Sequence, residues 1–264
     1  MNVYLKELKH NRKSLIVWSI CAAVLLGMSY LKFVSMYAGN VDINALMSQL
    51  PRMFAVLMGI GGSVDFSTAK GFYALLTAYS VYLMIFNAGL LGVRVIAREE
   101  DLKTTEFLYT KPISRSKVLF QKLLAALTCC IILNLVILLV SLATFPAADA
   151  SLSADIIIFS MFALLLQVIY LGLGAVCAVL SSNSSKAGGL IILILIGTLS
   201  LSKALDMMGS NSFLWIFTPV NYFVPQQYMY GQNINPLAYV LAALLISLTG
   251  YIMFTRYEKK DILV

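Results

Sequence analysis

The chain reads VLFQKLLAALTCCIILNLVILLVSLATF from residue 118 to residue 145. Lys122 is the only charged residue in this stretch. About 20 apolar residues are enough for a helix to cross the roughly 30 Å hydrocarbon core of a bilayer. Backbone groups in lipid must be hydrogen-bonded within the protein, and the run is continuous rather than alternating. The stretch therefore predicts a transmembrane helix and not a strand of a membrane barrel.

Five more runs of this kind occur along the chain. They predict further spans over residues 14–37, 71–94, 155–180, 185–205 and 236–255. Of the 264 residues, 60% are hydrophobic and only 12% are charged, whereas soluble domains have roughly 25% charged residues. We expect an all-α polytopic membrane protein, with six transmembrane helices in a single domain over residues 1–264.

The distribution of lysine and arginine predicts the orientation of these spans, because cytoplasmic loops are enriched in both residues. With the N-terminus inside, fifteen of the 19 basic residues fall on the inner side. These are Lys6, Lys9, Arg12, Lys13, Arg94, Arg98, Lys103, Lys111, Arg115, Lys117, Lys122, Lys186, Arg256, Lys259 and Lys260. We therefore expect both termini in the cytoplasm. The net charge of +7 follows from this topology, and no basic stripe with interleaved aromatic residues suggests a nucleic-acid partner.

Three segments differ from simple spans. Residues 1–13 predict an amphipathic helix lying on the inner leaflet, with a disordered basic tail as the alternative. Residues 38–70 predict a short interfacial helix that ends at Gly59, Gly61 and Gly62. Residues 206–235 contain prolines and aromatic residues suited to the headgroup layer, so we expect a re-entrant or surface-lying hairpin before the last span.

The sequence has no motif that indicates an enzyme. It has no phosphate-binding loop of the GxxxxGK[ST] type, no HExxH and no GxSxG. The four cysteines lie in apolar runs, and His10 is the only histidine, so no metal site is expected. We expect no catalytic residue and no cofactor in this chain.

Polar residues are rare within the predicted spans. Asn87, Asn134, Gln167 and Thr198 could line a pathway across the membrane, or they could form hydrogen bonds between helices. Ionisable residues are almost absent from the spans, which disfavours a carrier driven by protons or sodium ions.

The most informative loop is VIAREEDLKTTEFLYTKPISRSKVLFQK, residues 95–122. It begins with closely spaced opposite charges, and Lys111-Pro112 should end any helix there. Ser114 is suited to cap the helix that follows. The pattern predicts a short charged helix that could dock into a soluble partner, or simply a solvated positive loop.

Residues 97–117 of this loop resemble the corresponding loop of ABC-2 type permeases, the membrane subunits of ABC transporters. Members have an acidic pair, a (G/T)T-x-E-x-L stretch and then P-(I/V)-S-R followed by lysine. Here these positions are Glu99 and Glu100, residues 104–108, residues 112–115, and Lys117. Thr104 stands where glycine is more usual. Lys70-Gly71-Phe72, Thr218-Pro219 and the tail from Arg256 to Ile262 are also similar to members of the group.

The resemblance implies a permease of the cell membrane that forms the substrate pathway of an exporter. A separate ABC ATPase would bind ATP and Mg, and a second copy of the permease would complete a homodimer. The loop would carry the coupling helix that contacts the ATPase. The residues implied at that interface are Arg98, Glu99, Glu100, Thr105, Glu106, Phe107, Leu108, Pro112, Ser114 and Arg115. Two alternatives are a membrane-embedded assembly or interaction protein without transport, and a secondary carrier.

Overall fold

The computed structural model describes residues 3–39, 44–45, 49, 51, 53, 65–101, 114–181, 183–208, 213–224 and 235–259, with the backbone alone at 99–101 and 259. Six long helices account for most of these residues. They are α1 (Val3–Ala38), α4 (Ala69–Asp101), α6 (Arg115–Thr144), α7 (Leu152–Leu180), α8 (Ser184–Met208) and α10 (Pro236–Lys259). All six are long and apolar enough to cross a membrane, which confirms the expected all-α membrane fold.

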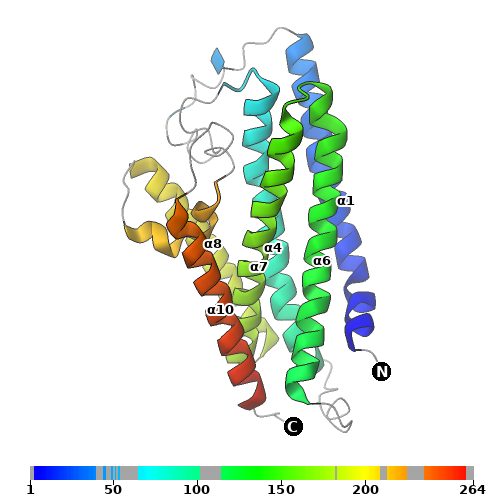
Figure 1. Cartoon of the computed structure of the whole chain (residues 1–264), viewed down its shortest axis with the longest axis vertical. Coiled ribbons are helices and arrows are strands. Elements are labelled where there is room, and N and C mark those ends of the chain that lie inside the picture. Colours follow the sequence, from blue (N-terminus) through cyan, green and yellow to red (C-terminus); the bar gives the residue numbers. More distant parts are fainter. Residues whose placement is uncertain are drawn as a thin grey trace.

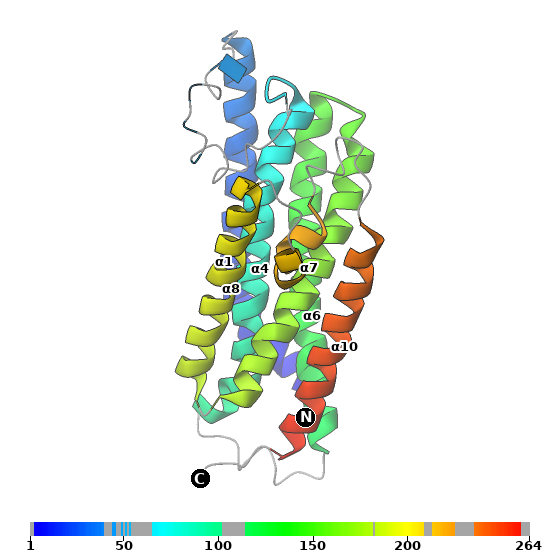
Figure 2. The same cartoon turned by 90° about the vertical axis from the view of Figure 1, so that its left-hand side faces the viewer.

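The helices form an elongated bundle, with α4 and α7 at its centre (Figures 1 and 2). α1 packs mainly on α6, α8 packs on α4 and α7, and α10 packs mainly on α7. Both ends of the described chain lie at the lower end in Figure 1, which we call the basic end. The described basic residues there are Lys6, Lys9, Arg12, Lys13, Arg94, Arg98, Arg115, Lys117, Lys122, Lys186 and Arg256.

Glycines allow α4 and α7 to approach each other closely. A Cβ atom added to Gly174 of α7 would lie 2.0 Å from the carbonyl oxygen of Gly89 in α4. A Cβ atom added to Gly92 would lie 2.3 Å from the carbonyl oxygen of Leu171. Small residues are typical where membrane helices pack backbone to backbone, because apolar side chains gain little by leaving lipid. The central helix pair therefore depends on the absence of side chains at these positions.

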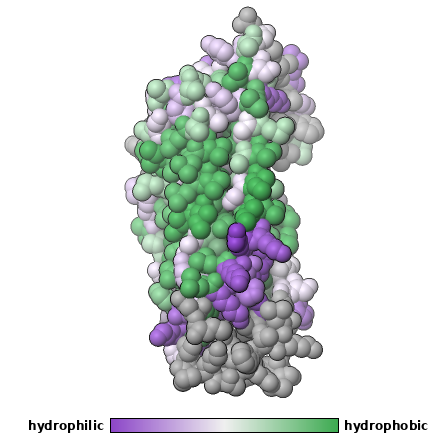
Figure 3. Space-filling model, turned by 90° about the vertical axis from the view of Figure 1, so that its right-hand side faces the viewer, coloured by the Kyte–Doolittle hydropathy of each residue, from purple (hydrophilic) through white to green (hydrophobic). Residues whose placement is uncertain are grey.

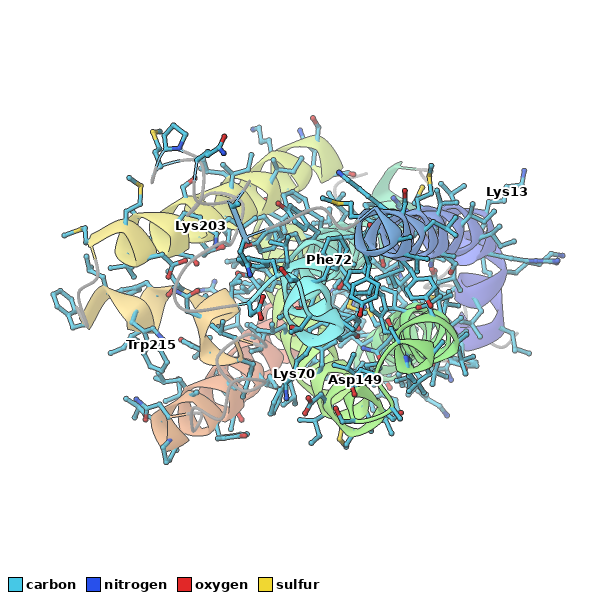
Figure 4. The ribbon with its side chains drawn as sticks, turned by 90° about the horizontal axis from the view of Figure 1, so that it is seen from above. Lys13, Lys70, Phe72, Asp149, Lys203 and Trp215 are labelled. Carbon is cyan, nitrogen blue, oxygen red and sulfur yellow. The ribbon has the colours of Figure 1, made fainter. Side chains whose placement is uncertain are left out.

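Aromatic residues hold the other end of the bundle together. Phe145, in the short 3-10 helix η1 (Phe145–Ala147), lies with its ring centroid 5.3 Å from that of Tyr30 and 4.8 Å from that of Tyr73. An ion pair of 2.9 Å between Lys70 and Asp155 joins the ends of α4 and α7. Figure 4, which looks down on this end, labels Lys70 next to Asp149 in the turn between α6 and α7. The Ser151 hydroxyl and backbone N–H bind the Asp149 carboxylate and keep its pKa below the usual value.

The segment before α10 contains two 3-10 helices, η2 (Phe213–Phe217) and η3 (Pro219–Tyr222). The residue that follows η3 is packed into the bundle, because Phe223 is fully buried and its ring stacks on that of Phe162 in α7, with centroids 5.3 Å apart. The hairpin expected over residues 206–235 is thus described only in part, since residues 209–212 and 225–234 lie outside the described residues. The same holds for most of residues 38–70, including Gly59, Gly61 and Gly62.

Residues 3–13 are helical, but they are not a separate element. They form the first turns of α1, which continues without a break to Ala38. A helix of this length extends about 54 Å, so it is longer than the roughly 30 Å of hydrocarbon that a membrane presents. Part of α1 therefore extends beyond the apolar core of the bilayer, and its first turns, which hold most of its charged residues, are the part suited to do so. The separate interfacial helix expected over residues 1–13 is therefore wrong for residues 3–13, because the residues from Arg12 to Ile16 contain neither proline nor glycine to interrupt the helix.

Candidate functional site

A buried ion pair joins α1 to α4 at the basic end. The guanidinium of Arg98 donates through Nη1 to Glu7 Oε2 and through Nη2 to Asn11 Oδ1, the latter over 2.8 Å. Asn11 Nδ2 donates in turn to the backbone carbonyl of Glu7 at 3.0 Å. Glu7 is fully buried, and only 12% of the Arg98 side chain is exposed. We refer to Glu7, Asn11 and Arg98 as the Glu7–Arg98 cluster.

This cluster gives Arg98 a role that the loop pattern did not predict. Arg98 was expected to face a partner, yet its guanidinium points into the bundle and binds α1. Glu7 was not singled out at all. The spacing of Glu7 in the sequence could have revealed it. Val3, Glu7 and Asn11 are four residues apart, so they share one face of a helix. Lys9 and Lys13 lie on another face. A carboxylate on the buried face of a helix requires a cationic partner.

The first turns of α1 also contact both neighbouring helices through hydroxyl groups. Arg94 of α4 donates to Ser14 Oγ at 2.8 Å. The hydroxyls of Tyr4 and Thr128, which belongs to α6, lie 3.2 Å apart. Together with the Glu7–Arg98 cluster, these bonds connect the start of α1 to α4 and α6, the two helices that flank the loop of residues 102–113.

Lys122 is the second buried charge at this end. It was expected among the charges of the inner loop, but its side chain is fully buried two turns into α6. Its ammonium group donates to the backbone carbonyl of Val95 in α4 at 2.9 Å. The long aliphatic stem lets the ammonium group reach the carbonyl of Val95, six residues before the end of α4 at Asp101.

Only the two ends of the expected coupling interface lie among the described residues. Glu99 and Glu100 belong to the last turn of α4, with their side chains not described. Thr105, Glu106, Phe107, Leu108 and Pro112 lie outside the described residues.

The far end of the loop is joined to α10. Ser114 occupies the N-cap position of α6, although its hydroxyl makes no capping bond. Arg115 donates through Nη1 to the backbone carbonyl of Glu258 at 3.0 Å, and the Ser116 hydroxyl donates to the carboxylate of Glu258. Arg115, like Arg98, is therefore engaged within the protein.

Two of the four mid-span polar residues form hydrogen bonds between helices. Asn134 of α6 donates to the carbonyl of Ser160 in α7 at 3.0 Å, and the Ser160 hydroxyl donates back to Asn134 Oδ1. The hydroxyls of Thr198 in α8 and Tyr170 in α7 lie 2.9 Å apart. For Asn134 and Thr198 the structure thus shows hydrogen bonds between helices, which is one of the two roles expected for the polar residues of the spans.

Gln167 and Asn87 are placed differently. Gln167 of α7 is fully buried, and neither its amide nitrogen nor its amide oxygen has a hydrogen-bond partner among the described residues. Asn87 of α4 is also buried, with 6% of its surface exposed. Burying an amide without hydrogen-bond partners costs folding free energy, so the position of Gln167 is not explained by stability in this conformation.

We expect the substitution Gln167→Met to raise the thermal stability of the purified protein. Methionine has a similar volume and shape and removes an amide that is unsatisfied in this conformation, which is worth about 1–3 kcal/mol. Asn134→Leu is the contrasting variant, because it leaves Ser160 without its partner and should lower the stability. Thermal unfolding in detergent measures both. A lower melting temperature for Gln167→Met would mean that the amide forms a bond that the sulfur cannot replace.

The described residues hold no group of three or more histidine, cysteine, aspartate or glutamate side chains that could bind a metal ion. The functional features are instead six membrane helices and a network of polar contacts on both sides of one loop. This arrangement defines a polytopic membrane protein whose helices are joined by polar contacts on both sides of the segment 102–113.

The sequence profile of a family described as "ABC-2 family transporter protein" matches residues 1–262. The chain therefore belongs to the ABC-2 transporter family and is a membrane permease subunit of an ABC transporter. Such a subunit is a transmembrane component and does not itself catalyse hydrolysis. No curated protein matches the chain.

Proposed function

We propose that this chain forms the substrate pathway of an ABC exporter and that a separate ABC ATPase drives it through the loop of residues 98–115. The ATPase would bind ATP and Mg, and two copies of the permease would complete the transporter. In this proposal the basic end faces the cytoplasm, with both termini of the chain, and the protein lies in the cell membrane.

The observation that supports this proposal best is the way in which the loop is connected at both ends. Arg98 links the start of the loop to α1 through Glu7 and Asn11. Arg115 links its end to α10 through the carbonyl of Glu258. The loop is also continuous with α4 and α6. A displacement of the loop by a partner would thus act on four of the six membrane helices at once.

In the proposed mechanism, ATP binding closes the two ATPase subunits and moves the loop. Glu99, Glu100, Thr105, Glu106, Phe107, Leu108, Pro112 and Ser114 would provide the contact surface. Arg98 and Arg115 would transmit the movement rather than form the centre of the contact. The four helices attached to the loop would then shift relative to α7 and α8, which opens the pathway on the other side.

The pathway itself would pass the polar residues of the core. Asn134 and Thr198 already bond to neighbouring helices, so in this proposal they hold the walls together. Gln167 of α7 and Asn87 of α4 would come into contact with substrate when α4 shifts relative to α7. An amide that lacks a partner in one conformation and gains one in another would favour the second conformation.

The test is a pull-down of the tagged permease from its native membranes, with variants in the loop. Phe107→Ala and Glu100→Lys are expected to lower the amount of bound ATPase, or its ATP turnover per complex, by about tenfold. An interface residue that matters typically contributes more than 1 kcal/mol. Lys32→Gln is the control, because it removes an exposed charge of α1 at the opposite end of the bundle.

Three results would count against the proposal. A preparation without any stoichiometric ATPase would favour an assembly protein or a secondary carrier. Loop variants that bind and activate the ATPase like the wild type would move the interface elsewhere. Transport that stops when the ion gradient is collapsed, but not when ATP is removed, would identify a secondary carrier.

A further inference from the structure

The exposed face of the first turns of α1 is basic. Lys9, His10, Arg12 and Lys13 are exposed and Lys6 is half-buried. Lys6, Lys9, His10 and Lys13 follow one another at the three- and four-residue spacing of a single helix face. We call Lys6, Lys9, His10, Arg12 and Lys13 the basic stripe.

No carboxylate neutralises the basic stripe within its own helix. Glu7 is the only acidic residue of α1, and it is buried on the opposite face and paired with Arg98. The positive charge of the stripe therefore remains directed away from the bundle. Figure 4 shows Lys13 extending outward, away from the other helices.

The same face of α1 becomes apolar directly after the basic stripe. Ile16, Val17, Ile20 and Val24 continue the spacing of Lys9 and Lys13, and all four are between 46% and 59% exposed. Figure 3 shows the boundary from this side, with hydrophilic side chains gathered below a broad hydrophobic band. One helix face thus presents cations next to a surface suited to acyl chains.

We propose that this face binds an anionic phospholipid, with its headgroup on the basic stripe and an acyl chain along Ile16, Val17 and Ile20. Lysine and arginine side chains near a membrane surface attract negatively charged headgroups, and clusters of them select anionic lipids. The order of charge and apolar surface along α1 is the order of headgroup and chain in a phospholipid. The inference does not depend on the coupling mechanism or on the transported substrate.

Two other occupants fit this face less well. A second copy of the chain in a twofold dimer would place the stripe against itself, because such an interface pairs identical patches, and like charges would repel. The soluble ATPase would have to reach a surface that continues without a break into the lipid-facing side of α1. The charge and the continuity with the apolar stripe both favour a lipid.

The test compares the binding of phosphatidylglycerol and phosphatidylcholine to the full-length protein, counted by native mass spectrometry from detergent. The wild type is expected to retain phosphatidylglycerol preferentially. Lys9→Gln/Lys13→Gln should reduce this preference by about 30-fold, the effect of two lysines near an anionic surface. Lys186→Gln/Arg256→Gln is the matched control, because it removes the same charge from exposed positions at the same end.

Four outcomes would overturn the proposal. The first is that Lys9→Gln/Lys13→Gln, folded with an unchanged melting temperature, retains phosphatidylglycerol like the wild type. The second is an equal loss in the control, which would mean that only the overall charge matters. The third is displacement of the lipid by soluble glycerol phosphate, which would indicate a site for free phosphate. The fourth is a loss of bound ATPase without a loss of lipid, which would assign the stripe to an acidic protein partner.

Discussion

Gly174→Ala is expected to abolish most of the folded, monodisperse protein. The added Cβ atom would lie 2.0 Å from the carbonyl oxygen of Gly89 and 3.2 Å from its Cα atom. Both are backbone atoms of α4, so no side chain can rotate to make room. The two central helices would have to separate along their contact, which would leave gaps among the core residues around them. We expect a cost of at least about 3 kcal/mol, the upper part of the usual range for overpacking.

Gly92→Ala tests the same contact from the other helix. Its Cβ atom would lie 2.3 Å from the carbonyl oxygen of Leu171 and 2.9 Å from the nitrogen of Ala175. Gly197→Ala in α8 is the control, because nothing lies within 4 Å of the position where its Cβ would be. Alanine favours a helix over glycine by about 1 kcal/mol in water, so this control should be neutral or slightly stabilised.

Size-exclusion chromatography of fluorescently tagged protein and thermal unfolding distinguish these outcomes. Gly174→Ala and Gly92→Ala should lose the monodisperse peak, whereas Gly197→Ala should keep it. Equal behaviour of the three variants would show that α4 and α7 are not packed through their backbones. A loss in Gly197→Ala alone would place the sensitive helix contact on the exposed face of α8.

The six helices could be predicted because each is a long apolar run, but their arrangement could not. In lipid all sides of a span are apolar, so the hydrophobic pattern does not reveal which face meets another helix. Gly89, Gly92 and Gly174 bring α4 and α7 together in the structure, yet nothing in the sequence paired these two helices. α1 illustrates the same limit, since its apolar lipid-facing side and its buried side differ little in composition.

Features of the site that lie within one short segment could be predicted from the sequence, whereas contacts between residues far apart in the chain could not. The loop pattern predicted the N-cap of α6 at Ser114, because that signal lies within one short segment. Arg98 and Arg115 were expected to face a partner, and their contacts with α1 and α10 were not predicted. The pairing of Arg98 with Glu7 joins residues far apart in the chain, so local spacing could not predict it. Lys122 was misplaced for a related reason. A lysine near the end of a span usually extends to water, and only the position of α4 explains why this one is buried.

Removing either charge of the Glu7–Arg98 cluster is expected to destabilise the protein by about 3–5 kcal/mol. Glu7→Leu leaves the guanidinium of Arg98 mostly buried without its carboxylate, and Arg98→Leu leaves the fully buried Glu7 without its guanidinium. An uncompensated buried charge accounts for a cost of this size. Lys203→Gln is the control, since it breaks the partly exposed pair of Lys203 and Asp206 at 3.3 Å and should change stability by less than about 1 kcal/mol.

The double variant Glu7→Leu/Arg98→Leu tests whether the cluster only stabilises the fold or also transmits movement from the loop to α1. Replacing a buried ion pair by apolar side chains is often neutral or stabilising, so the double variant should unfold near the temperature of the wild type. If the cluster also transmits movement from the loop to α1, ATP turnover and transport should remain uncoupled although the fold is restored. Thermal unfolding and ATP turnover of the complex, measured side by side, test this. A double variant that recovers both would make the cluster a structural contact only, and one that recovers neither would contradict the expected exchange of the ion pair for apolar packing.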